Sequence, residues 1–241
     1  MLDKPDLGDA RLSNLLHGAY GLITQELTFL PLGADPNTAV YKAVTPDETA
    51  YFVKLRRGAF DELSVRLPRY LKGHGVPHLV PVVATKAGAL WAGLEPYTVT
   101  LYPFVAGKNG YEVPFTAQHW RAFGAALKRL HTLKLPPELQ RGLRREAYDA
   151  EAREQVKTFL SRLDGAEPTD PIQNRLFALM RAHRAQVGDL VGRAERCARA
   201  LQDRPPAFVV CHSDLHAGNV LVDGSGFYLV DWDDPILAPK E

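Results

Sequence analysis

The 241-residue sequence predicts an α+β fold in two halves, because the periodicity of its apolar residues changes along the chain. Up to about residue 103, short runs rich in β-branched and aromatic residues alternate with turn residues, a pattern typical of an antiparallel sheet. From Thr116 onward, apolar residues recur at helical spacing. A chain of this length fits one bilobal domain or two small ones. The segment AGKNGYEVP at 106–114, with two glycines and a proline, is the best linker between the halves.

The first half is expected to form a mainly antiparallel sheet with one inserted helix. A short helix fits residues 9–20, and the inserted helix fits 59–72, where Gly73 and Gly75 end the pattern. The segment TPDET at 45–49 is typical of a turn between two strands. The strand candidates cover 22–30, 39–44, 50–55, LVPVVAT at 79–85, ALWAG at 89–93 and YTVTLY at 97–102.

The second half is expected to be mainly helical, with a small β element near its end. Thr116 is a suitable N-cap for a helix in which Trp120, Phe123 and Leu130 recur at helical spacing. The same periodicity predicts a helix over 148–163 and a long one over 172–202. Two short β runs, AFVVC at 207–211 and VLVDGSGFYLVD at 220–231, then bracket the segment CHSDLHAGNV.

The composition is that of an ordinary globular protein. Lys and Arg total 29 against 28 Asp and Glu, so no global field attracts nucleic acid or anionic lipid. The two cysteines, Cys197 and Cys211, are too few for a disulfide scaffold and indicate a reducing compartment. No signal-peptide pattern is present, and no apolar run approaches the roughly 18–20 residues of a membrane span. We therefore expect a cytoplasmic protein that binds neither nucleic acid nor membrane.

Candidate phosphate-binding residues lie in the first half. The sequence has no Walker loop and no GxGxxG motif, but PLGADPNTAVYKA at 31–43 reads as two strands joined by a turn that includes Asn37. Such a hairpin can lay backbone N–H groups over phosphates. Lys54, in the strand YFVKL, can reach into a cleft, because its neighbours point to the other face. A carboxylate of the next helix would steady its amine, with Glu62 the nearest candidate and Asp61 the alternative.

The segment CHSDLHAGNV at 211–220 is rich in groups that bind metals, and a zinc site is one interpretation of it. His212 and His216 would then need a helix in order to share a face. Gly218, the flanking β runs and the absence of an HExxH motif argue against that helix.

A phosphotransfer loop is the second interpretation of the same segment. The spacing of His212, Asp214 and Asn219 matches the H-x-D-x-x-x-x-N pattern of the kinase catalytic loop. Asp231 follows at the end of a β-hairpin, where a metal-binding aspartate should stand. Asp214 would orient a hydroxyl nucleophile, and oxygen ligands from Asn219 and Asp231 suit magnesium, which offsets the charge of a triphosphate. Together with the upstream lysine, the pattern favours this interpretation.

The segment HSDLHAGNVLVDGSGFYLVDWDD resembles the signature of the aminoglycoside phosphotransferase family, relatives of protein kinases. The resemblance extends through PLGADPNTAVYKA, YFVKLRRGAFDE, LYPFVAGKNGYEV and the helix at 120–131, and it is strongest with spectinomycin-type phosphotransferases. It implies a protein-kinase-like bilobal fold, with a nucleotide-binding lobe over 1–103 and a catalytic lobe over 104–241. It also implies ATP as the donor, Mg2+, and transfer to a hydroxyl of a small, polar, cationic molecule.

The resemblance implies roles for single residues. It makes Asp214 the catalytic base and Asn219 and Asp231 the magnesium ligands, while Lys54, steadied by Glu62, holds the phosphates. A second set of residues is expected at the two ends of the site. Adenine is expected to bond the Pro103 carbonyl and the Val105 N–H, since Pro103 has no N–H to give. At the other end, Asp233 and Asp234 are expected either to attract a cationic substrate or to cap the segment after the strand.

The chain departs from the family pattern at its end, because it stops ten residues after Asp231, where several further helices are expected. We therefore expect an incomplete catalytic lobe, with the apolar faces of 116–132 and 172–202 partly exposed and prone to self-association. Two alternative functions remain. One is a kinase of another small alcohol, of the choline, homoserine or sugar type, and the other is a truncated, non-catalytic nucleotide-binding module.

Overall fold

The computed structural model describes residues 3–33, 35–165 and 168–240. These residues form two compact units, one containing the chain up to Arg144 together with Val209–Lys240, and the other containing Arg145–Phe208. The α+β class expected from the sequence is confirmed. The expected lobe boundary at residue 103 falls within the first unit, and the assignment of two lobes stays a prediction.

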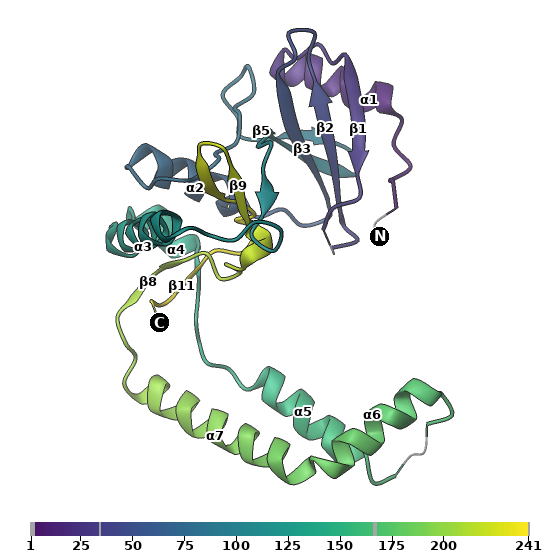
Figure 1. Cartoon of the computed structure of the whole chain (residues 1–241), viewed down its shortest axis with the longest axis vertical. Coiled ribbons are helices and arrows are strands. Elements are labelled where there is room, and N and C mark those ends of the chain that lie inside the picture. The colour runs from purple at the N-terminus through teal and green to yellow at the C-terminus, as the bar shows by residue number, and fades with distance from the viewer. Residues whose placement is uncertain (1–2, 34, 166–167, 241) are drawn as a thin grey trace. The chain divides into compact units, whose positions relative to one another are not determined.

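The centre of the first unit is a five-stranded antiparallel sheet in the order β1-β2-β3-β5-β4 (Figure 1). In its register, Lys54 of β3 lies between Val40 of β2 and Thr100 of β5. The turn TPDET joins β2 and β3 as expected, closed by a hydrogen bond from the Thr45 N–H to the Thr49 carbonyl (3.0 Å). The strands are β1 (Glu26–Leu30), β2 (Thr38–Val44), β3 (Ala50–Arg57), β4 (Ala92–Leu94) and β5 (Tyr97–Pro103).

The two faces of this sheet differ in composition. One face packs on helix α1 (Asp9–Leu15) and on the π-helical turn that continues it (Leu16–Tyr20), so the helix expected over 9–20 is present. Tyr41, Val53 and Leu101 lie opposite one another in the register and are fully buried in this core. Full burial of an aliphatic side chain contributes about 1.5–3 kcal/mol. By alternation, Lys54 points to the opposite face.

Helix α2 (Leu63–Gly73) is the inserted helix, and it begins at Leu63 rather than at residue 59. Asp61 explains the later start. Its carboxylate accepts a hydrogen bond from the Leu63 N–H (2.9 Å), and its carbonyl accepts one from the Ser64 hydroxyl (2.6 Å). Such contacts satisfy the N–H groups that a helix start leaves unpaired. The helix buries an apolar side that includes Leu67 and Leu71.

The strand expected over LVPVVAT (79–85) is wrong. Within the described residues, this segment forms one isolated bridge, from Leu79 to Leu229, and no ladder. Pro81 has no N–H to give to a ladder, which explains why an apolar run does not become a strand here. The segment supplies core side chains instead, because Leu79 and Val82 are buried.

The rest of the first unit carries two small sheets, in the orders β10-β9-β6 and β7-β11-β8, and two helices. Helix α3 starts at the expected cap: the Thr116 hydroxyl accepts from the His119 N–H (3.2 Å), and the His119 ring accepts from the Thr116 N–H (3.5 Å). The hairpin β9–β10 confirms the β run at 220–231. The elements are β6 (Lys108–Asn109), α3 (Ala117–Thr132), α4 (Pro137–Gly142), β7 (Arg144–Arg145), β8 (Phe208–Cys211), β9 (Val220–Asp223), β10 (Gly226–Leu229) and β11 (Ile236–Pro239).

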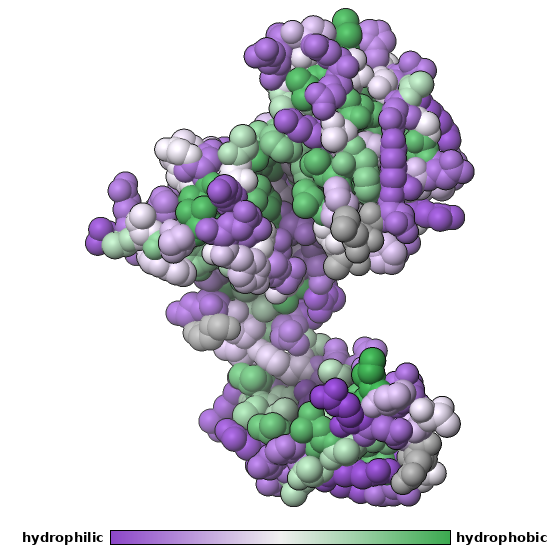
Figure 2. Space-filling view, turned by 45° about the vertical axis from the view of Figure 1, so that its right-hand side comes forward, coloured by the Kyte–Doolittle hydropathy of each residue, from purple (hydrophilic) through white to green (hydrophobic). Residues whose placement is uncertain are grey.

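The second unit consists of α5 (Glu151–Arg162), α6 (Pro171–Ala182) and α7 (Arg184–Asp203). The single helix expected over 172–202 is therefore wrong. The chain leaves helical geometry at His183 (φ −106°, ψ 11°) and starts again at once. Large apolar side chains reach the surface of this unit (Figure 2), namely Ile172, Leu176, Leu179 and Leu190. Helical periodicity would place these residues on the buried side of a helix, and their exposure contradicts that placement, although it agrees with the expected partly exposed face of 172–202. Self-association stays a prediction.

None of the described helices combines the length and apolar character that a membrane crossing requires.

Candidate active site

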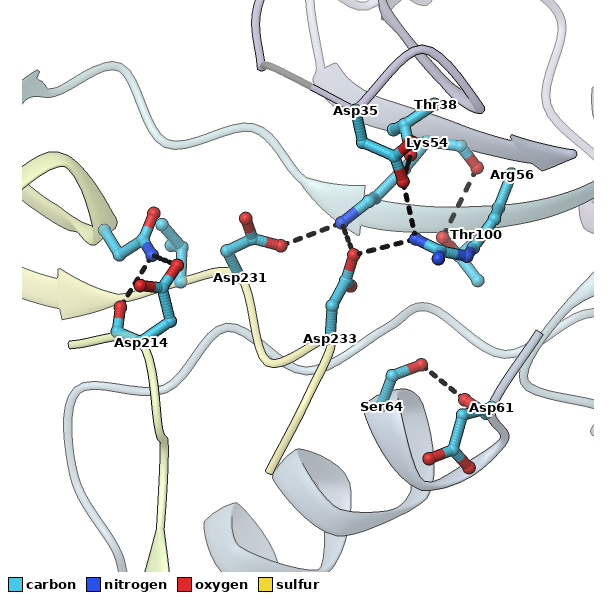
Figure 3. A network of polar contacts seen from close by, with 12 residues as sticks. Asp35, Thr38, Lys54, Arg56, Asp61, Ser64, Thr100, Asp214, Asp231 and Asp233 are labelled. Carbon is cyan, nitrogen blue, oxygen red and sulfur yellow. Dashed lines mark hydrogen bonds and ion pairs between the residues drawn. The ribbon is translucent and has the colours of Figure 1, made fainter. Parts of the chain in front are cut away.

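A cavity of about 450 Å³ opens on the sheet face opposite the α1 core. Strands β3 and β5 supply one wall of it, and the loop before α2 supplies another (Figure 3). The lining is mixed, with two cations, two carboxylates, hydroxyl groups and aromatic rings. It consists of Lys54, Arg56, Ala59, Phe60, Asp61, Ser64, Thr98, Thr100, Tyr102 and Asp233. A polar, charged cavity of this size suits a charged small molecule better than an apolar one.

Lys54 is the central cation of the cavity, as the alternation along β3 predicts. Its ammonium nitrogen lies 2.8 Å from Asp231 Oδ1 and 2.6 Å from Asp233 Oδ2, and its side chain is 14% exposed. Burial favours the neutral amine, but Asp233 and Asp231 outweigh burial and raise the pKa of Lys54. Burial likewise opposes ionisation of Asp231, yet the ammonium holds the pKa of that carboxyl below its usual range. The ammonium and the Asp231 carboxylate are therefore both charged at neutral pH.

The expected pairing of Lys54 with Glu62 is not formed in the structure. The Glu62 carboxylate lies 3.8 Å from Arg66, one turn further along the chain. The alternative partner, Asp61, uses its carboxylate to bind the Leu63 N–H. Both residues immediately precede α2, whose first N–H groups are free to attract carboxylates. Asp231 and Asp233 occupy the position at the ammonium that the sequence assigned to Glu62.

Arg56 is the functional candidate that the sequence reading missed. Its guanidinium lies 3.2 Å from Asp35 Oδ2 and 3.5 Å from Asp233 Oδ2, and it donates to the Ala59 carbonyl (3.1 Å). Alternation from Lys54 was a sufficient signal, since residues two apart on a strand share a face. Asp233, expected to attract substrate, instead holds both cations of the cavity.

The turn between β1 and β2 holds Asn37, as the hairpin interpretation requires. Asp35 orders this turn, because its carboxylate accepts from the Asn37 N–H (2.9 Å) and amide (3.2 Å) and from the Thr38 hydroxyl (3.3 Å). These bonds, with the Asn37 N–H contributing most, hold the pKa of Asp35 below its usual range. Ala34, in the same turn, lies outside the described residues.

The loop 211–220 leaves β8 and returns through a three-residue helical turn, Ala217–Asn219. The Asn219 amide donates to the Asp214 carbonyl (2.8 Å) and to its carboxylate (3.2 Å), which brings together two residues of the H-x-D-x-x-x-x-N pattern. Asp214 is exposed, so its carboxylate is open to a ligand. Ser213 adopts a left-handed backbone (φ 68°), a conformation that costs a non-glycine residue of the order of 1 kcal/mol.

Both histidines of this loop form hydrogen bonds with backbone groups. The His212 Nε2 bonds the Val230 carbonyl (2.9 Å), which ties the loop to the chain entering Asp231, and burial lowers the pKa of His212. The His216 Nδ1 accepts from the Gly218 N–H (2.9 Å). In the described part of the chain, no three His, Cys, Asp or Glu residues are placed to hold a metal together. The geometry gives no support to the zinc interpretation.

The two expected magnesium ligands, Asn219 and Asp231, belong to neighbouring segments. The Val230 N–H donates to the Asn219 carbonyl (3.0 Å), and Asp231 follows with a left-handed backbone (φ 63°) that turns its carboxylate toward Lys54 (Figure 3). The amide nitrogen of Asn219 is held by Asp214, which orients the amide. Carboxylate and amide oxygens are hard donors, and the ionised Asp231 makes the set suitable for magnesium. The residues therefore fit this ion.

The remaining expected residues occupy the ends of the site. Asp234 pairs with Arg144 (3.0 Å), and its carbonyl accepts a hydrogen bond from the Ser213 hydroxyl. Pro103 ends β5, and the Phe104 N–H donates back to Ala50 of β3 (3.1 Å). Peptide groups of an extended chain alternate in direction. The Pro103 carbonyl belongs to the same peptide group as the Phe104 N–H, so it is directed away from β3, as an adenine contact would require.

Comparison with known families identifies the family of the chain. A family model described as the phosphotransferase enzyme family (APH) matches residues 26–235. The chain belongs to this family. Among curated proteins, no sequence match reaches significance.

Solved structures of the phosphotransferase enzyme family match nearly the whole chain. A spectinomycin phosphotransferase, APH(9)-Ia, in complex with ADP and spectinomycin is 30% identical, covers 98% of this chain and 72% of its own, and gives a TM-score of 0.89. Its AMP-bound complex is 29% identical, covers 96% of this chain and 71% of its own, and gives 0.84. An aminoglycoside phosphotransferase from Alicyclobacillus acidocaldarius, 17% identical with a TM-score of 0.63, covers 99% of this chain and 69% of its own and supports the fold alone.

The family membership settles the class of enzyme. The chain has the kinase-like fold of the phosphotransferase enzyme family, with an antiparallel N-terminal sheet and a helical remainder. It is a phosphotransferase of the small-molecule kinase type.

Proposed function

We propose that this phosphotransferase moves the γ-phosphoryl group of ATP to a hydroxyl of an aminocyclitol antibiotic such as spectinomycin. The observation that carries the proposal is the contact of Lys54, at the cavity, with Asp231 and Asp233, because it combines a phosphate-binding cation with a carboxylate, Asp231, that suits a metal. The choice of acceptor rests on the 30% identity to a structure that holds ADP and spectinomycin.

The nucleotide-binding lobe, residues 1–103, supplies the donor side of this proposal. Lys54 exchanges a carboxylate for phosphate oxygens when the nucleotide binds. The turn that contains Asn37 would give a backbone N–H to the phosphates by exchanging the Asp35 carboxylate, which accepts the Asn37 N–H in the structure, for a phosphate oxygen. Adenine bonds the Pro103 carbonyl and the Val105 N–H at the start of the catalytic lobe, residues 104–241. Glu62 pairs with Arg66 in the structure, so a role at the phosphates would need that helix turn to move.

Asp214 supplies the acceptor side. Its exposed carboxylate, held by the Asn219 amide, accepts the proton of the substrate hydroxyl. The hydroxyl oxygen forms a bond to the γ-phosphorus, the bond from that phosphorus to the bridging oxygen breaks, and ADP leaves with the bridging oxygen. The proton remains on Asp214 until product release. Positioning and charge stabilisation account for most of the rate in such transfers.

Asn219 and Asp231 would hold magnesium, which would supply positive charge to offset the triphosphate. The chain's own contribution is the arrangement of these oxygens, which the His212 and Val230 bonds fix.

A cationic acceptor suits the acidic residues near Asp214. Asp214 and Asp234 are both exposed, and the hydroxyl of Ser213, the residue before Asp214, donates to the Asp234 carbonyl. Phosphorylation of an antibiotic hydroxyl in the cytoplasm would remove the drug from action, so we also propose a role in resistance.

The proposal is tested by a phosphotransfer assay with ATP, Mg2+ and a panel of acceptors: spectinomycin, other aminoglycosides, choline and homoserine. We expect ADP and phosphorylated spectinomycin in equal amounts, identified by mass spectrometry. Transfer to choline or homoserine but to no aminocyclitol would assign the chain to the other small-alcohol kinases. ATP·Mg binding without transfer to any acceptor would identify a non-catalytic module. Expression in a spectinomycin-sensitive bacterium tests the proposed role in resistance.

A further inference from the structure

Arg56 joins three segments of the chain at the cavity. It follows Lys54 by two residues on β3 and lies on the same face of the sheet (Figure 3). Its guanidinium contacts Asp35 in the β1–β2 turn, Ala59 in the loop before α2, and Asp233 in the segment after β10. These segments are far apart in sequence, and the planar donor fork of arginine suits a residue that must bind several oxygens at once.

The charges of the site form an alternating chain. Asp35 binds Arg56, Arg56 and Lys54 share Asp233 Oδ2, and Lys54 also binds Asp231. The three carboxylates outnumber the two cations, so an added triphosphate meets repulsion unless cations remain beside it. When Lys54 turns to phosphate oxygens, Asp233 loses its nearest ammonium. Arg56 is then the cation still in contact with that carboxylate.

We propose that Arg56 is a positioning residue for the phosphate end of the bound nucleotide. Through Asp35 it holds the β1–β2 turn at the cavity, and through Asp233 it keeps a cation at the carboxylate that Lys54 releases. The proposal rests on the proposed nucleotide-dependent function. It gives a role to Arg56, which the expected kinase pattern does not include. Arg56 therefore contributes to the binding of the phosphates and not to the binding of the nucleoside.

A purely structural role would have a different signature. The Arg56 side chain is 34% exposed, and exposed ion pairs contribute little to stability. We therefore expect Arg56→Met, which keeps the aliphatic stem, to melt within a few degrees of the wild-type protein. Arg57→Met is the matched control, because Arg57 is the next residue on β3, is exposed, and points to the other face.

The test is a calorimetric titration of ATP, ADP and adenosine, with Mg2+ present, into the full chain and its variants. For Arg56→Met we expect ATP affinity to fall by about tenfold, as for the loss of one charge-assisted hydrogen bond, with adenosine affinity unchanged. Arg56→Lys should recover part of the loss, since it restores charge without the fork. Arg57→Met should bind all three ligands as the wild type does.

The contribution of Asp35 is tested by the Asp35→Asn variant and its double variant with Arg56→Met. If Arg56 acts through the turn, the double variant binds ATP no more weakly than Arg56→Met alone. Equal ATP affinity for Arg56→Met and Arg57→Met, or an equal loss for ATP and adenosine, would overturn the proposal. A wild-type protein that binds none of the nucleotides would overturn the proposed function itself, and the two failures are thereby distinguished.

Discussion

Replacing Lys54 by methionine should leave two carboxylates side by side without the ammonium between them. Breaking a fully buried pair costs about 3–5 kcal/mol, whereas an exposed pair is worth about 0–1 kcal/mol. Lys54 is 14% exposed, but Asp231 and Asp233 are 46% and 38% exposed, so water screens the carboxylates left behind. We therefore expect a loss of about 1–3 kcal/mol. For a chain of this length, that corresponds to a fall in Tm of about 2–12 °C.

Thermal unfolding followed by circular dichroism measures this effect. Lys72→Met is the control, because Lys72 is exposed at the end of α2. The double variant Lys54→Met/Asp233→Asn should regain part of the lost stability, since it removes one of the two facing carboxylates. If Lys54→Met melts with the Lys72→Met control, or if the double variant is less stable than the sum of its single changes, the charge-pair reasoning is refuted.

Two further predictions concern packing and pH. Gly107→Ala should destabilise the fold, because the added Cβ would lie 2.8 Å from the Val222 carbonyl oxygen. Gly124→Ala in α3 is the control, since its Cβ meets no atom within 4 Å, and it should stabilise the fold by about 0.5–1 kcal/mol. Chemical denaturation compares the free energies of unfolding of the two variants. His212 has a lowered pKa when folded, so its neutral form contributes stability above a pH of about 6.5 that is lost as pH falls through the folded pKa. Between pH 7 and 5, the wild-type Tm should fall more steeply than that of His212→Asn, and equal slopes would show that His212 does not titrate as assigned.

Local signals in the sequence predict local structure well in this chain. The Thr116 cap, the TPDET turn and the β9–β10 hairpin depend on neighbouring residues, and each is formed as expected. LVPVVAT fails because its apolar run is equally suitable for a strand and for an irregular core segment. The split between α6 and α7 has no glycine or proline to mark it, so the helical periodicity continues across His183.

The site shows the same division between near and distant partners. The bond between Asp214 and Asn219 spans five residues, and the loop spacing selects both residues as members of one motif. The partners of Lys54 lie 177 and 179 residues away, where no local pattern selects among the carboxylates. Glu62 was the reasonable expectation from the adjoining helix, but the start of α2 at Leu63 leaves it one turn from Arg66. The role of each site residue therefore stays a prediction until variants are measured.

The most direct test of the central claim is phosphotransfer by Asp214→Asn beside the wild-type protein, with ATP, Mg2+ and spectinomycin. Because Asp214 accepts the hydroxyl proton, we predict that turnover falls by about 10²–10⁴-fold, as for the loss of a general base. ATP affinity, measured by calorimetry on the same samples, should change little, since this exposed carboxylate is not among the residues that line the cavity. Wild-type turnover in Asp214→Asn would contradict the account, and so would a loss of ATP affinity as large as the loss of turnover.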